Sequence, residues 1–120
     1  MKMPDANADP VCFIPLTPAV FHILLAVAEC DRHGYGVMRA VEEYSGGKLK
    51  LGPGILYGSL KQLLASGWIE EVAGPGGERR RYYRLSEFGK RVAAAEAQRL
   101  SNLLMVARAN QLLPGVEGAP

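Results

Sequence analysis

Apolar residues recur at helical spacing in the first third of the chain. One stripe consists of Phe21, Leu24, Leu25 and Ala28, and a second consists of Val20, Ile23 and Val27. Thr17 and Pro18 supply an N-cap and a proline at the first helical position, so the pattern predicts a helix from Pro18 to about Cys30. A helix that is apolar on two sides is buried on two sides. We therefore expect the second stripe to contact another subunit.

Shorter segments follow, and glycines separate them. We expect Gly34 to end the first helix in the left-handed conformation and Tyr35–Tyr44 to form a second helix. The segment Lys48–Leu51 alternates polar and apolar residues, which predicts a short third strand beside a hairpin. A compact helix over Pro53–Ser66, closed by Gly67, completes the central helical part of the chain.

A basic β-hairpin is predicted directly after this helix. Its strands are Ile69–Val72 and Arg81–Leu85, and the connection between them holds a glycine-rich turn and a run of arginines. A charge run is most often a solvated surface. A short helix followed by a basic hairpin, however, is typical of the winged helix-turn-helix fold, whose helix enters the major groove of DNA. The predicted fold is mainly α with a small β-hairpin.

A long helix is predicted to follow the hairpin. Ser86 caps it, and Pro114 follows its expected end at Leu113. Two adjacent seams on this helix extend beyond what a small domain can bury, so we expect subunit pairing. Together with the second stripe of the first helix, the predicted dimer interface contains Ala93, Ala97, Leu100, Leu103, Leu104 and Ala107. A helix folded back over its own domain is the alternative.

These elements divide the chain into four parts. We expect a flexible N-terminal arm over residues 1–15 and a winged helix-turn-helix domain over residues 16–85. A C-terminal dimerisation helix over residues 86–113 and a disordered tail over residues 114–120 follow. One domain of this size is large enough to bury a core.

The distribution of charge is more informative than the overall composition. The 120 residues carry a net charge of only +2 and are 48% hydrophobic, as in an ordinary globular domain. From Arg32 to Arg91, however, there are eleven cations and six anions, which suits a locally cationic DNA-binding face. The longest apolar stretch is too short to span a membrane, no signal peptide is evident, and Cys12 and Cys30 read as free thiols, so we expect a cytoplasmic protein.

The candidate chemistry favours binding over catalysis. The glycines around Pro53 let the start of that helix approach another surface, and Tyr57, Ser59 and Lys61 can offer contacts to DNA. His22 lies inside an apolar helix, and Cys30 and His33 lack a second ligand pair, so no catalytic residue, metal or cofactor is predicted. Side chains alternate along a strand, so the arginines of the hairpin cannot all point the same way, and Glu70 and Glu71 can pair with some of them.

Trp68, which follows the helix-ending Gly67, admits two interpretations. In the simpler one it anchors the hairpin to the domain. In the other it forms a wall of a small-molecule pocket.

Four segments in this order resemble the PadR family of bacterial transcriptional regulators. They are His33-Gly34-Tyr35-Gly36, the run from Gly52 to Leu60, the run from Leu63 to Ile69, and Arg79 to Leu85 followed by Ser86-Glu87-Phe88-Gly89. The likeness covers about residues 16 to 110 and is similar to the smaller subtype with a single C-terminal helix. It implies a homodimer joined through that helix, repression at near-palindromic operators and, in some members, release of DNA by a phenolic or drug-like effector.

Carried over by position, the resemblance implies a DNA-binding surface. Its residues are Tyr35, Gly54, Ile55, Tyr57, Gly58, Ser59, Lys61, Arg79, Arg80 and Arg81. The family often has Thr or Ser where this chain has Ile55, so a hydroxyl that could bind phosphate is missing. This difference and the modest net charge keep open an alternative, a winged-helix protein-interaction module that no longer binds DNA.

Overall fold

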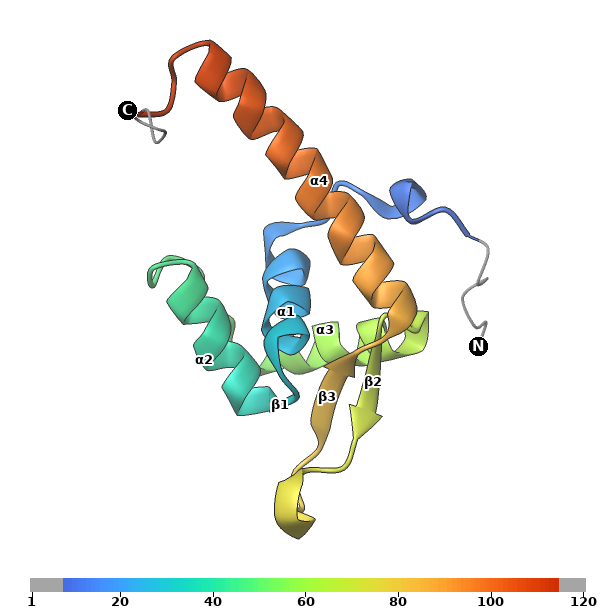
Figure 1. The fold of residues 1–120 in the computed structure, drawn as a ribbon. Coiled ribbons are helices and arrows are strands. Elements are labelled where there is room, and N and C mark those ends of the chain that lie inside the picture. The colour runs from blue at the N-terminus through green and yellow to red at the C-terminus, as the bar shows by residue number, and fades with distance from the viewer. Residues whose placement is uncertain (1–7, 115–120) are drawn as a thin grey trace.

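The structure is a computed structural model that describes residues 8–114. The described chain contains a 3-10 helix η1 and then its main helices and strands in the order α1, β1, α2, α3, β2, β3 and α4, with a second 3-10 helix, η2, between β2 and β3 (Figure 1). Their bounds are η1 Pro10–Phe13, α1 Pro18–Glu29, β1 Arg32–His33, α2 Gly34–Tyr44, α3 Pro53–Ser66, β2 Ile69–Val72, η2 Pro75–Gly77, β3 Tyr82–Leu85 and α4 Glu87–Ala109. Helices α1, α2 and α3 cluster together, the hairpin lies at one side, and α4 rises away from them.

The predicted capping residues are present at the start of α1, the end of α3 and the start of α4. The Thr17 hydroxyl accepts a hydrogen bond from the Val20 amide at 3.2 Å, and Gly67 closes α3 in the left-handed conformation with a φ of 78°. Ser86 caps α4, because its Oγ accepts from the Gly89 amide at 2.9 Å and donates to the Gly67 carbonyl at 2.6 Å. The same serine therefore ties the start of α4 to the end of α3.

The sheet has three antiparallel strands in the order β1-β3-β2, and its third strand is not the predicted one. Arg32 and His33 pair with Tyr83 and Tyr82, whereas residues 48–51 form a loop. In that loop the Leu49 amide donates to the Ser45 hydroxyl at 2.8 Å, and the side chain of Leu49 packs against the core. The alternation of residues 48–51 thus reflects an anchored loop rather than a strand.

The prediction that Gly34 ends the first helix is also wrong. Helix α1 ends at Glu29, because Cys30 adopts an extended conformation with a φ of −167°. His33 then caps α2, and Gly34 is the first residue of that helix. The two helices are therefore joined by a strand instead of a glycine turn.

The buried residues form one core between α1, α2, α3, the hairpin and the first turns of α4. The most buried aliphatic side chains of this core are Ile23, Leu24, Val37, Val41, Leu56, Leu60, Ile69 and Val92. Three predicted interface residues, Ile23, Val27 and Ala93, are buried in this core, and Val20 packs against it. A side chain with almost no exposed surface has none left to bury in a dimer, so the second stripe of α1 belongs to the core of the single chain.

The described part of the N-terminal arm, residues 8–15, is folded onto the domain, which differs from the flexible arm that we predicted. Phe13 makes edge-to-face contacts with Trp68 and Phe88, with ring centroids 5.4 and 5.8 Å apart. The next segment is held by the buried carboxylate of Glu96, which accepts hydrogen bonds from the Leu16 amide and from Arg99. Residues 1–7 of the arm and residues 115–120 of the predicted tail lie outside the described residues.

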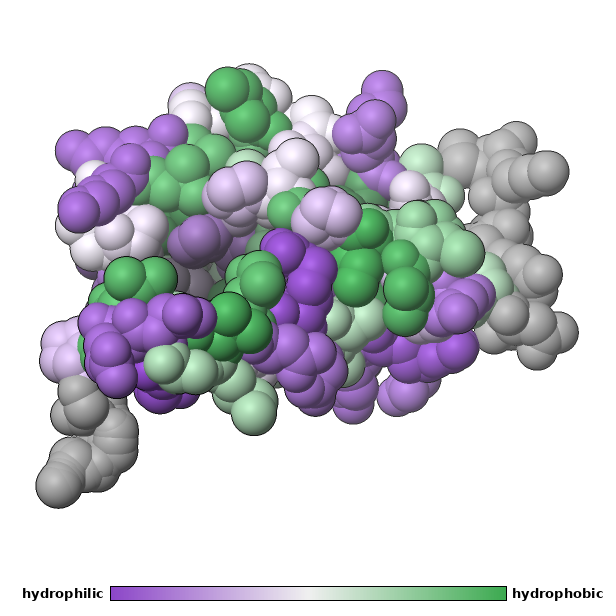
Figure 2. Space-filling view, turned by 90° about the horizontal axis from the view of Figure 1, so that it is seen from above, coloured by the Kyte–Doolittle hydropathy of each residue, from purple (hydrophilic) through white to green (hydrophobic). Residues whose placement is uncertain are grey.

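Helix α4 ends at Ala109 instead of Leu113, since Asn110 leaves the helix and Gln111 takes a positive φ of 58°. Its C-terminal half extends beyond the rest of the domain (Figure 1). Four consecutive apolar side chains there, Leu103 to Val106, are exposed. Seen from above, several hydrophobic side chains lie open on the surface among hydrophilic ones (Figure 2). Within residues 8–114, no helix is long and apolar enough to cross a membrane.

Candidate nucleic-acid interface

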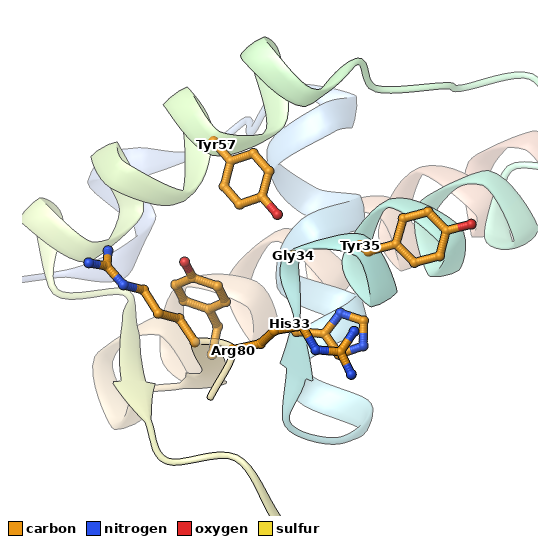
Figure 3. A pocket seen from close by; sticks show the side chains of 7 residues that line it. His33, Gly34, Tyr35, Tyr57 and Arg80 are labelled. Carbon is orange, nitrogen blue, oxygen red and sulfur yellow. The ribbon is translucent and has the colours of Figure 1, made fainter. Parts of the chain in front are cut away.

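The start of α2, the first half of α3 and the C-terminal part of the wing meet around one surface pocket (Figure 3). Here the wing is the β2–β3 hairpin together with its connection, residues 69–85. The pocket has a volume of about 270 Å³ and is lined by His33, Gly34, Tyr35, Tyr57, Arg80, Arg81 and Tyr83. Four of the predicted DNA-binding residues, Tyr35, Tyr57, Arg80 and Arg81, are thus brought together by elements that are distant in the sequence.

His33 organises the α2 side of this pocket. Its Nδ1 accepts a hydrogen bond from the Gly36 amide at 3.1 Å, so the imidazole acts as the N-cap of α2. The ring lies parallel to Tyr35, with centroids 6.5 Å apart, and makes an edge contact with Tyr82 at 5.3 Å. Burial and the nearby Arg80 guanidinium lower the pKa of His33 below its ordinary value of 6.5, so the neutral, capping form is favoured.

Tyr35 and Tyr57 present their side chains on the exposed side of the pocket. Tyr35 is 55% exposed, and the Arg39 guanidinium lies 5.9 Å from its ring centroid. Tyr57 is 49% exposed and its ring lies against Gly34, where a Cβ would come within 2.6 Å of Cζ. Gly34 therefore leaves the space that lets Tyr57 bridge α3 and α2.

Helix α3 divides into a buried face and an open face. Leu56, Leu60 and Leu63 are buried, while Gly54, Ile55, Gly58 and Lys61 are exposed. Ile55 is 63% exposed. Ser59 is only partly exposed, because it lies near the buried side of the helix. The predicted reading face thus contains the glycines, Ile55, Tyr57 and Lys61, with Ser59 at its edge.

The arginines of the wing differ in their partners. Arg80 forms an ion pair with Glu78, which lowers the pKa of that carboxyl, and Arg81 pairs with Glu71 at 3.4 Å. Arg79 is exposed, and within residues 8–114 no acidic partner lies in ion-pair range of its guanidinium. Among Arg79, Arg80 and Arg81, Arg79 is therefore the one whose charge is not paired with a carboxylate of the described residues.

Tyr82 and Tyr83 of β3 point to opposite faces of the sheet, and contacts of the outward-facing residues hold the wing in place. Tyr83 is buried in the core, whereas Tyr82 is half-buried and contacts the His33 ring. Arg84, the next outward residue, is bound through two nitrogens by Asp31, at 2.9 and 3.1 Å. This ion pair ties β3 to the segment that precedes β1, and it fixes the wing relative to α2.

Sequence reasoning missed the roles of His33, Gly34 and Asp31. Histidine is not among the common N-caps, and the space beside Gly34 depends on a tyrosine more than twenty residues away. The Asp31–Arg84 pair joins residues more than fifty positions apart. No local pattern signals any of these contacts. Within the described residues, no group of three or more His, Cys, Asp or Glu side chains could hold a metal ion.

A helix-turn-helix pair followed by a basic wing defines the class of winged-helix DNA-binding proteins. Residues 23–95 match the transcriptional regulator PadR-like family. The chain therefore belongs to the PadR-like family of transcriptional regulators.

Solved structures share the fold of this chain. A PadR family transcription regulator from Clostridium difficile is 20% identical, with a TM-score of 0.66 over 79% of this chain and 99% of that one. A transcriptional regulator from Clostridium thermocellum is 21% identical, with a TM-score of 0.63 over 76% of this chain and 87% of that one. At these identities the likeness shows the fold alone.

A relative by sequence is an uncharacterised 37.1 kDa protein in a transposon of Streptomyces fradiae. It is 35% identical over 81 residues, which cover 68% of this chain. The matched region spans only 22% of that protein's length.

Proposed function

We propose that the protein is a homodimeric repressor that places α3 of each subunit in the major groove of its operator. The observation that carries the proposal is the convergence of Tyr35, Tyr57 and the wing arginines around the open side of α3. Tyrosine hydroxyls and arginines are suited to phosphates, while a helix with an open face can approach base edges. Repression follows from steric exclusion of polymerase when such a dimer covers a promoter.

The exposed half of α4 supports the proposed dimer. Leu103 and Leu104 belong to the predicted seam, and both are exposed in the single chain. A run of exposed leucines on a helix that extends beyond its domain is costly in water and is relieved by pairing with a second copy. Ala97, Leu100 and Ala107 continue the same side of the helix. The interface that we propose is therefore narrower than the predicted one and excludes Ile23, Val27 and Ala93.

A second pocket is the candidate site for a small-molecule effector. It has a volume of about 280 Å³ and is lined by Phe13, Pro15, Leu16, Thr17, Val20, Gln62, Leu63, Ser66 and Trp68. Its walls come from the N-terminal segment, α1 and the end of α3, and they include two aromatic rings. A small aromatic ligand that binds one placement of α3 better than another would shift the DNA-binding equilibrium.

The test of the proposed function is binding to a labelled fragment from upstream of the protein's own gene, with excess competitor DNA at low and moderate salt. Retention that survives competitor and weakens with salt would support specific binding through a basic surface. Failure to bind at any salt concentration would favour the protein-interaction alternative. Trp68 is the only tryptophan of the chain, so its fluorescence reports ligand binding at the second pocket directly.

A further inference from the structure

The outward side of α3 carries a strip without side chains. Gly54 and Gly58 are four residues apart and therefore lie one above the other, on the side of the helix opposite Leu56, Leu60 and Leu63. Among residues 8–114, a Cβ added at either glycine would meet no atom within 4 Å, and neither residue has a positive φ. The fold itself thus places no demand for glycine at these two positions.

Glycine in a helix interior lowers stability relative to alanine, because its backbone loses the most freedom on folding. Gly58 lies in the interior of α3, where alanine would fit without contact. Because the fold does not require glycine at this position, we infer that the requirement comes from a binding partner. The bare strip lets another surface approach the helix backbone closely.

Ile55 lies beside this strip, and the described part of the chain leaves its side chain largely uncovered. Its side chain is 63% exposed, and it leaves the helix on the side of the strip away from Tyr57, which is held against Gly34. The first turn of α3 has no side-chain cap, so its amide groups are open to a negatively charged partner. Lys61 lies about one turn further along the same open face.

An apolar side chain next to a close-approach strip, an uncapped helix start and a basic wing fits the major groove better than a protein surface. In that groove, thymine presents a C5-methyl group, and aliphatic side chains recognise it by contact. We propose that Ile55 reads the C5-methyl of one thymine in each half-site of the operator. This inference rests on the proposed placement of α3 in the major groove.

The test replaces thymine by deoxyuridine, which removes only the methyl group and keeps base pairing. Duplexes are first selected from a random library by the wild-type protein, and each thymine of the selected site is then replaced singly. At one thymine per half-site we expect affinity to fall about fourfold, the effect of withdrawing one buried methyl-sized group from contact. The Ile55→Ala variant should bind the thymine and deoxyuridine duplexes equally, and Ile55→Val should restore most of the difference.

Controls separate this contact from general effects on folding and binding. Val11→Ala truncates a side chain that is similarly exposed, at 59%, but lies in η1, and it should leave the thymine preference unchanged. Gly58→Ala should raise the melting temperature while weakening binding to every selected duplex, because it fills the bare strip.

Two results would overturn the inference, and they are distinguishable. If duplexes are selected but no deoxyuridine substitution weakens binding, or the loss is equal in Ile55→Ala, then Ile55 reads no methyl group although the protein binds DNA. If the wild-type protein enriches no duplex at all, the proposed function fails together with this inference. If Ile55 contacts a protein partner instead of DNA, we expect this second result.

Discussion

The ring of Tyr57 in α3 lies directly against the backbone of Gly34 at the start of α2, in space that any other residue at position 34 would fill. A Cβ at Gly34 would lie 2.6 Å from Cζ and 2.7 Å from Cε1 of the tyrosine. The contact joins the two helices of the helix-turn-helix at the pocket that also holds Arg80 and Arg81. The position of an exposed tyrosine on the proposed reading helix is thus set by a glycine on its neighbour.

The Gly34→Ala variant should move the Tyr57 ring and weaken DNA binding with little loss of stability. The ring is the free end of a flexible side chain, so it can swing away at small cost, and Gly34 has no positive φ. We expect DNA affinity to fall about as much as in Tyr57→Ala, by roughly tenfold, the size of one lost charge-assisted hydrogen bond. Fluorescence anisotropy and thermal melting measure the two quantities.

The double variant Gly34→Ala, Tyr57→Ala supplies the control for this prediction. If Gly34 acts through the tyrosine, adding Gly34→Ala to Tyr57→Ala should change the affinity no further. Additive losses in the double variant would show that Gly34 contributes to binding independently.

Arg79 should contribute more to the salt dependence of DNA binding than either of its neighbours. Arg80 and Arg81 already pair with Glu78 and Glu71, so in the proposed complex each would have to exchange a carboxylate for a phosphate. We expect Arg79→Ala to reduce the slope of log affinity against log salt by about 1 per subunit, and Arg80→Ala and Arg81→Ala to reduce it by less. Arg108→Ala, at the far end of α4, is the control that removes equal charge. Equal slopes for all four variants would contradict a role for the wing.

His33 should make the folded state less stable as the pH falls through the histidine range. Its pKa is lowered in the folded chain, by burial first and by Arg80 second, so the unfolded chain binds the proton more readily. The stabilisation is complete above the ordinary pKa of 6.5 and is lost as the pH falls below it. Urea unfolding between about pH 7.5 and about pH 5 measures this loss, in a window above the titration of most carboxyl groups.

The His33→Asn variant tests the assignment of that pH dependence. Asparagine keeps a capping acceptor for the start of α2 but does not titrate. We expect its stability to vary less with pH than that of the wild type over the same window. A slope identical to the wild type would show that the pH dependence arises elsewhere.

Charge on the exposed seam of α4 should dissociate the proposed dimer. Leu103→Glu would bury an unpaired carboxylate in the interface, so we expect the dimer dissociation constant to rise by at least about 100-fold. Asn102→Glu adds the same charge on the other side of the helix and keeps an acceptor for the Gln98 amide, so it should leave the dimer intact. Sedimentation velocity measures both. Equal behaviour of the two variants would place the interface elsewhere.

The sequence predicts the parts of this fold that depend on local signals. Thr17, Ser86 and Gly67 cap their helices as expected, because capping is decided within a few residues. The hairpin is predicted by its glycine-rich turn between two strand-like segments. The order of these elements was sufficient to predict a winged helix.

The remaining features depend on contacts that are distant in the sequence. A two-residue strand such as β1 has no periodicity to detect, and the apolar stripe of Ile23 and Val27 shows that a face is buried without showing what covers it. The aromatic contacts of Phe13 with Trp68 and Phe88 likewise join three separate segments. For the proposed DNA surface, the sequence predicts the residue types and indicates that Glu70 or Glu71 can pair with some of the arginines. The fold adds that Glu71 pairs with Arg81 and that Arg80 pairs with Glu78.

The central claim is that two copies of this chain present two α3 helices to successive major grooves. The most direct measurement is a hydroxyl-radical footprint on a selected duplex, combined with the number of chains bound per duplex. We predict two chains per duplex and two related protected regions whose centres lie about 34–36 Å apart, one helical turn of DNA. A single protected region with one chain bound, or no protection at low salt, would contradict the account.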